Sequence, residues 1–227
     1  MIGIIGAMDI EVSMLKDNMK ESRNVTVSGI NFITGKLFDH EAVVAKCGVG
    51  KVNAALCTEA MILEFSPDMI INTGIAGSLT EKLSLLDVAV AKSVILHDFD
   101  LSYFGYPRGL VPGDETVEIP SDVAISKAIE GIVKGMGVGC EYGVIATGDQ
   151  FICSDEKKEE IGREFSAIAC EMEGGAIGLV CHINKIPFTI IRAISDSANG
   201  ANMDYETFSE RAAKISSKIV ENFIMSI

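Results

Sequence analysis

The sequence predicts an α/β fold, with one domain over residues 1–227 and a mixed central β-sheet flanked by helices. Short apolar, β-branched runs alternate with longer amphipathic stretches, a pattern typical of strands joined by right-handed crossover helices. No Pro- or Ser-rich linker, internal repeat or low-complexity tract divides the 227 residues. Hydrophobic residues make up 48% and charged residues 22% of the chain, a composition typical of a folded domain and too apolar for a disordered chain.

Eight apolar runs rich in β-branched residues are predicted to form strands. They cover residues 2–5, 30–34, 42–46, 69–72, 88–91, 142–146, 167–170 and 188–194. The second and third are expected to be antiparallel, because residues 35–40 between them have the character of a turn.

Six amphipathic segments are predicted to form helices. They cover residues 9 to about 18, 51–65, 122–134, 155–165, 173–182 and 205 to the end. The charged run at 155–160 is interpreted as a solvated helix face. The last helix is expected to bury a stripe of apolar residues spaced three or four apart: Phe208, Ala212, Ile215, Ile219 and Phe223.

The chain is acidic, because 32 Asp and Glu residues outnumber 19 Lys and Arg residues and give a formal charge of −13. An acidic surface repels phosphate backbones and anionic lipids, so neither nucleic acid nor a membrane is an expected partner. A small molecule is expected instead. No apolar run approaches the ~20 residues of a membrane span, and the amino end meets Asp9 and Glu11 too early for a secretion signal. Six scattered cysteines without a C-x-x-C pair predict core thiols in a reducing compartment, the cytoplasm.

Five predicted strands run into segments that carry glycines, hydroxyls or carboxylates. In open α/β sheets, ligands bind in the crevice beyond the carboxyl ends of the strands. We therefore expect these five segments to share one rim: residues 6–11, 73–78, 147–151, 171–175 and 195–197.

Some of these segments also have a purely structural interpretation. Gly3-x-x-Gly6 lacks the G-x-G-x-x-G spacing of dinucleotide-binding folds and is consistent with a tight strand-to-helix turn. Residues 73–77 are consistent with a turn whose glycines let backbone N–H groups approach a ligand. Glu171 and Glu173 share a face if the stretch is extended, whereas only one reaches the cleft if a helix begins between them.

Two further positions have competing interpretations. Asp196 precedes residues 197–200, so it could form an N-cap or Asx-turn, or a buried ion pair with Arg192. His97 has no second histidine at ligand spacing, so a hydrogen-bonded structural histidine is expected rather than a zinc site. A Ser/His/Asp hydrolase is not expected, because the G-x-S-x-G elbow is absent. No metal and no cofactor is predicted.

Six motifs follow one another along almost the whole chain: Gly3-Ile4-Ile5-Gly6-Ala7-Met8-x-x-Glu11-Val12, Gly48-Val49-Gly50-Lys51-Val52-Asn53-Ala54-Ala55, Ile70-Ile71-Asn72-Thr73-Gly74-x-Ala76-Gly77, Gly148-Asp149-x-Phe151-Ile152, Glu171-Met172-Glu173 and Arg192-Ala193-Ile194-Ser195-Asp196. Together they resemble the 5′-methylthioadenosine/S-adenosylhomocysteine nucleosidases of the purine nucleoside phosphorylase superfamily. The resemblance implies a nucleoside phosphorylase-like fold and a homodimer. It also implies irreversible hydrolysis of the N9–C1′ bond of 5′-methylthioadenosine, S-adenosylhomocysteine and 5′-deoxyadenosine, in methionine and adenine salvage.

The resemblance also implies roles for individual residues. Asp196 corresponds to the acid at adenine N7, and Glu11 to the group that activates water. Glu173 corresponds to the carboxylate that binds the ribose hydroxyls, and Arg192 to a contact with the water. The other implied substrate-binding residues are Met8 and Phe208 near the 5′-alkylthio group, Phe151 and Ile152 at adenine, Met172 against the sugar, and Ala76, Gly77 and Ser195. The partner subunit is expected to contribute Leu101, Phe104 and Pro112.

The chemistry of the reaction agrees with two carboxylates in different roles. Adenine leaves poorly as an anion, so a donor shares a proton with N7 as the bond breaks. The sugar develops oxocarbenium character and needs a base and a water on its opposite face. One position departs from the family pattern: Ile75 stands where many relatives carry a small or hydroxyl residue near the water. Positioning of the water is therefore expected to depend on Glu11 and Arg192.

Three other functions fit parts of the pattern. A phosphorylase would use phosphate, which requires clustered cations, but no arginine adjoins Gly6 or Gly74 and Glu11 would repel the anion. A futalosine-type nucleoside hydrolase would act on a related substrate. A non-catalytic nucleoside-binding module would need only the Phe151 stack and the ribose contacts.

Overall fold

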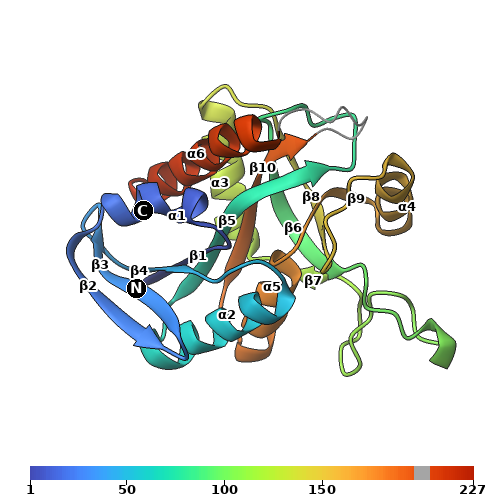
Figure 1. The fold of residues 1–227 in the computed structure, drawn as a ribbon, viewed down its shortest axis with the longest axis horizontal. Coiled ribbons are helices and arrows are strands. Elements are labelled where there is room, and N and C mark those ends of the chain that lie inside the picture. The colour runs from blue at the N-terminus through green and yellow to red at the C-terminus, as the bar shows by residue number, and fades with distance from the viewer. Residues whose placement is uncertain (197–204) are drawn as a thin grey trace.

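The strands form one mixed sheet with helices on both faces (Figure 1). This computed structural model describes residues 1–196 and 205–227. The strands within these ranges are β1 (Ile2–Gly6), β2 (Lys20–Val27), β3 (Ile30–Leu37), β4 (His40–Lys46), β5 (Met69–Ser78), β6 (Val88–Leu96), β7 (Ile119–Pro120), β8 (Cys140–Thr147), β9 (Ala167–Glu171) and β10 (Phe188–Asp196). The helices are α1 (Asp9–Asp17), α2 (Lys51–Phe65), α3 (Val123–Gly135), α4 (Asp155–Phe165), α5 (Gly174–Asn184) and α6 (Tyr205–Ile224), with a 3₁₀ turn η1 (Ser102–Phe104).

Part of the sheet closes on itself. β1 lies between β4 and β5 and is parallel to both, and β4, β3 and β2 continue outward as antiparallel hairpins. On the other side, β5, β9, β8, β6 and β10 form a ring, because β10 pairs with both β6 and β5. The sequence predicts the rim on an open sheet, whereas this part of the sheet is closed. The sheet curls because β5 is long: its first residues pair with β1 and its last two pair with β9.

Two sets of helices cover the two faces of the sheet (Figure 1). Met61 of α2 and Ile177 of α5 are fully buried in the core on one face. Leu15 of α1, Ile129 of α3 and Ile219 of α6 are fully buried in the core on the other face. Burial of each such side chain contributes about 1.5–3 kcal/mol. None of the described helices combines the length and apolar character that crossing a bilayer requires.

The predicted α/β fold is confirmed, and each predicted strand and helix has a counterpart in the structure. The predictions missed β2, which carries the polar sequence KESRNVTV and is almost entirely exposed. An edge strand of this kind buries little, so it lacks the apolar alternation that identifies a strand from sequence. They also missed the two-residue strand β7.

The interpretation of residues 73–77 as a turn is wrong. β5 continues through Ser78, and these residues are buried. Gly74 and Gly77 therefore lie within a strand, where glycine weakens the sheet and often marks a close approach by another group. The approaching groups are carboxylates of the site described next.

Candidate active site

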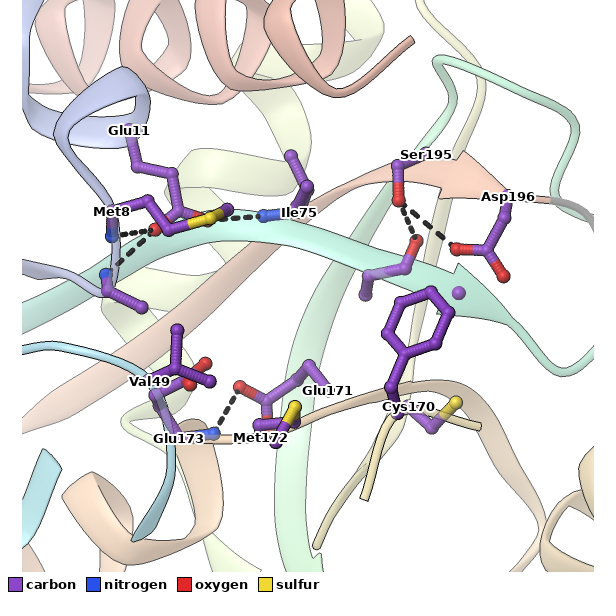
Figure 2. Close-up of a pocket in the computed structure, with 14 residues that line it drawn as sticks. Met8, Glu11, Val49, Ile75, Cys170, Glu171, Met172, Glu173, Ser195 and Asp196 are labelled. Carbon is purple, nitrogen blue, oxygen red and sulfur yellow. Dashed lines mark hydrogen bonds between the residues drawn. The ribbon is translucent and has the colours of Figure 1, made fainter. Parts of the chain in front are cut away.

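A cavity opens where β1, β5, β9 and β10 end (Figure 2). All five predicted rim segments contribute to it, although they are far apart in the sequence. The lining residues are Ala7, Met8, Glu11, Val49, Ile75, Ala76, Gly77, Phe151, Cys170, Glu171, Met172, Glu173, Ser195 and Asp196.

Glu11 is held by backbone donors at the start of α1. Its Oε2 accepts hydrogen bonds from the N–H groups of Ala7 (2.7 Å) and Met8 (2.9 Å), and its Oε1 accepts one from Ile75 of β5 (3.1 Å) (Figure 2). The side chain is buried. Burial raises the pKa of Glu11, against the opposing effects of Arg192 and these backbone donors. A fixed carboxyl with a raised pKa is suited to accept a proton near neutral pH.

Gly74 gives this carboxylate its space. A Cβ at Gly74 would lie 2.5 Å from Glu11 Oε1 and 3.3 Å from Arg192 Nη1. The absence of a side chain in the middle of β5 is therefore a requirement of the carboxylate beside it.

We expect Gly74→Ala to lower the free energy of unfolding by about 1–3 kcal/mol, because the added methyl group displaces Glu11 from its three backbone donors. Gly131→Ala is the matched control, since a Cβ there meets nothing within 4 Å. At this exposed position inside α3, alanine should stabilise the helix by up to about 1 kcal/mol relative to glycine. Urea denaturation of both variants measures the difference. Equal stabilities would contradict the close approach.

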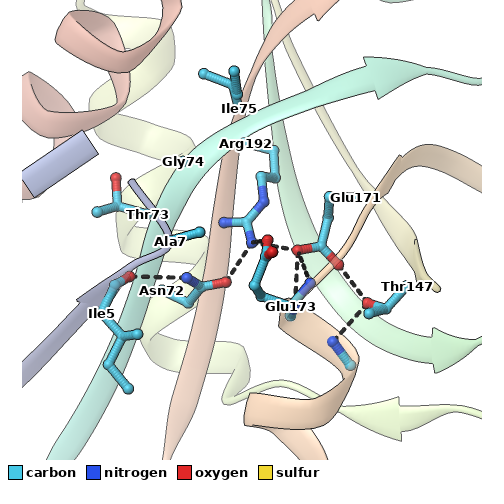
Figure 3. A network of polar contacts seen from close by, with 12 residues as sticks. Ile5, Ala7, Asn72, Thr73, Gly74, Ile75, Thr147, Glu171, Glu173 and Arg192 are labelled. Carbon is cyan, nitrogen blue, oxygen red and sulfur yellow. Dashed lines mark hydrogen bonds and ion pairs between the residues drawn. The ribbon is translucent and has the colours of Figure 1, made fainter. Parts of the chain in front are cut away.

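The carboxylate of Glu171 accepts four hydrogen bonds from neighbouring protein groups (Figure 3). Its Oε2 accepts from the N–H groups of Glu173 (3.0 Å) and Gly174 (2.7 Å) and from Arg192 Nη2, and its Oε1 accepts from Thr147 Oγ1. The alternative left open for the two glutamates is thereby resolved: both border the cavity, but Glu171 has few lone pairs left for a ligand.

Arg192 lies beneath the cavity and does not line it. The side chain is 2% exposed, and its Nη2 donates to Glu171 and to Asn72 Oδ1 (2.5 Å) (Figure 3). The interpretation that Arg192 forms an ion pair with Asp196 is wrong, because its buried ion-pair partner is Glu171. Two acidic groups on the cavity side, Glu11 and Glu173, also face this cation.

Glu173, immediately before α5, presents its carboxylate to the cavity. Its Oε1 accepts from the N–H of Gly50 (2.8 Å), and its Oε2 lies 3.9 Å from Arg192 Nη2. Burial raises the pKa of Glu173 to about 7, and the charge of Glu171 adds to that effect. Glu173 therefore keeps acceptor capacity for a ligand.

Asp196 reaches the cavity through an irregularity in β10. The register against β5 shifts between Ile194 and Asp196, which places Asp196 opposite Gly77. Bulges of this kind often re-aim a side chain at a functional site. A Cβ on Gly77 would lie 2.8 Å from Asp196 Oδ2, so this glycine also makes room for a carboxylate. Ser195 Oγ donates to Asp196 Oδ1 (3.1 Å) (Figure 2).

The remaining predicted residues divide into three groups. Met8, Ala76, Gly77, Phe151, Met172 and Ser195 line the same cavity as the carboxylates. Ile152 is buried and lines the adjoining hollow with Gln150. The structure does not bring Phe208, Leu101, Phe104 or Pro112 into the lining among the described residues. The interpretation of Asp196 as an N-cap or Asx-turn depends on residues 197–200, which lie outside the described residues.

Lys158 is the site residue that sequence analysis misassigned. The run at 155–160 was interpreted as a solvated helix face, yet Lys158 is 3% exposed and its Nζ lies 2.7 Å from Asp196 Oδ2. A usable signal was its spacing from Ile161, since these are the two buried residues of α4 and lie three apart. Val49 and Cys170 of the lining were also not assigned, because neither type suggests a binding role on its own.

His97 is buried, but the expectation that its side chain is hydrogen-bonded is wrong. Neither ring nitrogen has a partner among the described residues. The ring instead packs so closely on Gly148 that a Cβ there would lie 2.3 Å from Nε2. Burial lowers the pKa of His97, which favours the neutral ring that such packing requires.

Comparisons with known proteins agree on the family. Residues 1–225 match the model of the phosphorylase superfamily. The chain is 43% identical to the 5′-methylthioadenosine/S-adenosylhomocysteine nucleosidase of Staphylococcus haemolyticus over 226 residues, which are 99% of each protein. It resembles the structure of the Neisseria meningitidis nucleosidase in complex with methylthio-immucillin-A, with a TM-score of 0.94, 37% identity, and 100% and 99% of the two chains covered. The futalosine hydrolase of Helicobacter pylori is also similar, with a TM-score of 0.94, 34% identity, and coverage of 100% and 97%.

Proposed function

The chain belongs to the phosphorylase superfamily, and within it we propose that the protein is a nucleosidase. It hydrolyses the N-glycosidic bond of 5′-methylthioadenosine and S-adenosylhomocysteine, and also of 5′-deoxyadenosine, to adenine and the 5′-substituted ribose. One observation carries the proposal: Glu11, Glu173 and Asp196 line a single cavity, although Glu11 is far from the other two in the sequence. The named relatives and the ligand-bound neighbours support the same activity.

The two carboxyl groups act on opposite sides of the bond that breaks. Asp196 donates a proton to adenine N7 while the electrons of the C1′–N9 bond pass into the base. Glu11 accepts a proton from a water molecule as the water oxygen bonds to C1′. Glu173 accepts hydrogen bonds from the ribose hydroxyls. Arg192 pairs with Glu171 and faces the carboxylates of Glu11 and Glu173, so its charge stabilises their positions. Phe151 and Met172 pack on the base and the sugar.

The lining favours water over phosphate as the nucleophile. Among the described residues that border the cavity there is no lysine or arginine. The nearby Arg192 guanidinium is bound to Glu171 and Asn72. A phosphate dianion would therefore meet Glu11 without a cation to balance its charge.

The test is incubation with 5′-methylthioadenosine in phosphate-free buffer, with chromatographic detection of free adenine. We expect adenine release at a rate that added phosphate leaves unchanged. Release that requires phosphate would instead identify a phosphorylase. No release under either condition, with nucleoside binding intact, would identify a binding module.

Futalosine hydrolysis is the second candidate, because a structure of a futalosine hydrolase is as similar in fold as the nucleosidase structures. Comparison of kcat/KM for the two nucleosides separates them. We expect 5′-methylthioadenosine to be cleaved, and a higher kcat/KM for futalosine would reassign the preferred substrate.

Substrate affinity is expected to depend on pH through Glu173. The pKa of about 7 means that Glu173 loses its proton as the pH rises through 7, and the ionised form is the better acceptor for ribose hydroxyls. Between pH 6 and 8 the Kd for 5′-methylthioadenosine should fall about tenfold. Titration calorimetry on the Asp196→Asn variant measures this without turnover. Addition of Glu173→Gln should remove the dependence, and a pH dependence that persists would contradict the assignment.

We also propose that the protein is a homodimer in which the partner subunit completes the pocket. Two large apolar side chains are exposed, Phe104 (70%) and Val52 (79%), and a partner subunit could cover them. The segment that carries η1 projects away from the body (Figure 1). Leu101, Phe104 and Pro112 of this segment are outside their own cavity, which is consistent with a role in a neighbouring one. Sedimentation should detect a dimer, and an active monomer would contradict the proposal.

The same proposal includes the cellular setting that the sequence suggested. All six cysteines are free thiols, as expected in the reducing cytoplasm. The products, adenine and a 5′-thio ribose, are the compounds that methionine and adenine salvage consume. Incubation of cells with labelled 5′-methylthioadenosine tests this role, since label should appear in free adenine only when the protein is present.

A further inference from the structure

Lys158 is a buried charge that the reaction described above does not use. It lies on α4, is 3% exposed, and its Nζ is 2.7 Å from Asp196 Oδ2. Lys158 does not line the cavity, whereas Asp196 does. The ammonium group therefore reaches the substrate only through the carboxyl group of Asp196.

The two oxygens of Asp196 have different surroundings. An ammonium group has only hydrogen-bond donors, so the oxygen that it contacts, Oδ2, is the one without a proton. When Asp196 is protonated, its proton is then on Oδ1, on the side of Ser195 Oγ (3.1 Å) (Figure 2). Ser195 can turn its own hydroxyl proton toward the carbonyl of Ala76 (3.4 Å), which leaves Oδ1 free to donate.

We propose that Lys158 is a positioning residue for the acid: it determines which oxygen of Asp196 carries the proton and stabilises the carboxylate that forms when this proton passes to adenine N7. The inference rests on the proposed nucleosidase function. In the step, the O–H bond of Asp196 breaks, its electron pair stays on oxygen and an N7–H bond forms. The C1′–N9 electron pair passes into adenine, and Lys158 keeps all three of its protons.

A cation beside the acid affects the rate in two opposite ways. In general, an adjacent cation makes an acid a stronger proton donor, but it also favours the ionised form of the acid before the reaction. Among the described residues, two other titratable groups line the smaller hollow that Asp196 shares with Ile152. Burial raises the pKa of the Cys170 thiol of β9 to about 12, so the thiol is neutral, and Glu171 of the same strand is occupied by Arg192. Lys158 is thus the adjacent cation that can produce these effects.

The experiment compares the pH profile of kcat/KM for 5′-methylthioadenosine in three variants and the unaltered protein. In Lys158→Met the alkaline limb should move to higher pH, and the rate at the plateau should fall roughly three- to tenfold. Lys158→Arg keeps the charge and should keep the limb in place. Lys157→Met is the matched control, because Lys157 is the neighbouring lysine of α4 and its Nζ pairs with the carboxylate of Glu160 (2.9 Å).

The outcomes separate this inference from the proposed function. If the unaltered protein releases no adenine, the proposed function fails. If it does, and Lys158→Met shows an unmoved limb with an equal loss of rate at every pH, Lys158 is only structural and the inference is overturned. Should Lys158→Met not fold, Lys158→Gln replaces it under the same criteria. A limb displaced in Lys158→Arg as far as in the neutral variant would also overturn the inference.

Discussion

Asparagine in place of Asp196 is expected to lower kcat for adenine release by about 10²–10⁴-fold, with KM changed by less than about threefold. The amide can still donate a hydrogen bond to N7, so binding persists. It cannot transfer a proton, so adenine would leave as an anion. The loss should therefore be in kcat, which identifies an interaction specific to the transition state.

Steady-state kinetics on the purified variant test this expectation, with Asp68→Asn as the control. Asp68 is exposed and pairs with the amino terminus, so the same chemical change there should leave kcat unchanged. Circular dichroism and thermal unfolding check that the fold is intact. A near-normal kcat in Asp196→Asn would refute the role of this residue as the acid.

Glutamine in place of Glu11 is expected to lower kcat by a similar 10²–10⁴-fold, because a neutral amide cannot accept the proton of the attacking water. This variant should also lose stability. The carboxylate accepts three backbone N–H groups, and an amide NH₂ in place of one oxygen leaves at least one of these donors without an acceptor, at a cost of about 1–3 kcal/mol.

The two effects are separable by measurement. Urea denaturation gives the loss of stability, and kinetics well below the transition give the loss of kcat in folded protein. Asp9→Asn is the matched control, because Asp9 is on the same helix and pairs with Lys46 (2.7 Å) at the exposed surface. Asp9→Asn should change neither quantity by much. A Glu11→Gln variant that is destabilised but catalytically normal would limit Glu11 to a structural role.

The fold could be predicted from sequence wherever burial imposes a pattern. β1, β5 and β10 are continuous apolar runs because both of their faces are covered, and α6 shows its buried stripe: Ala212, Ile219 and Phe223 are almost fully buried. β2 escaped prediction because it buries almost nothing. The closed ring was also not predicted, since no local sequence pattern indicates that β10 pairs with β5 as well as with β6.

The sequence predicts the carboxylates of the site, but not the cationic side chains that pair with them. Glu11, Glu173 and Asp196 belong to motifs, and the structure brings them to one cavity. Lys158 lies within a highly charged run, where one inward-facing lysine has no distinctive signal. Nor does sequence alone show that Glu171 rather than Asp196 binds Arg192, because the pairing depends on the order of strands in space.

β5 leaves no room for side chains beside two acids of the cavity. A Cβ on Gly74 would lie 2.5 Å from Glu11 Oε1, and a Cβ on Gly77 would lie 2.8 Å from Asp196 Oδ2. Redesign of the enzyme for bulkier or smaller nucleosides therefore has little freedom there, since any enlargement pushes an acid out of place. New specificity would instead come from Met8, Val49 and Met172, which line the same cavity from other segments of the chain.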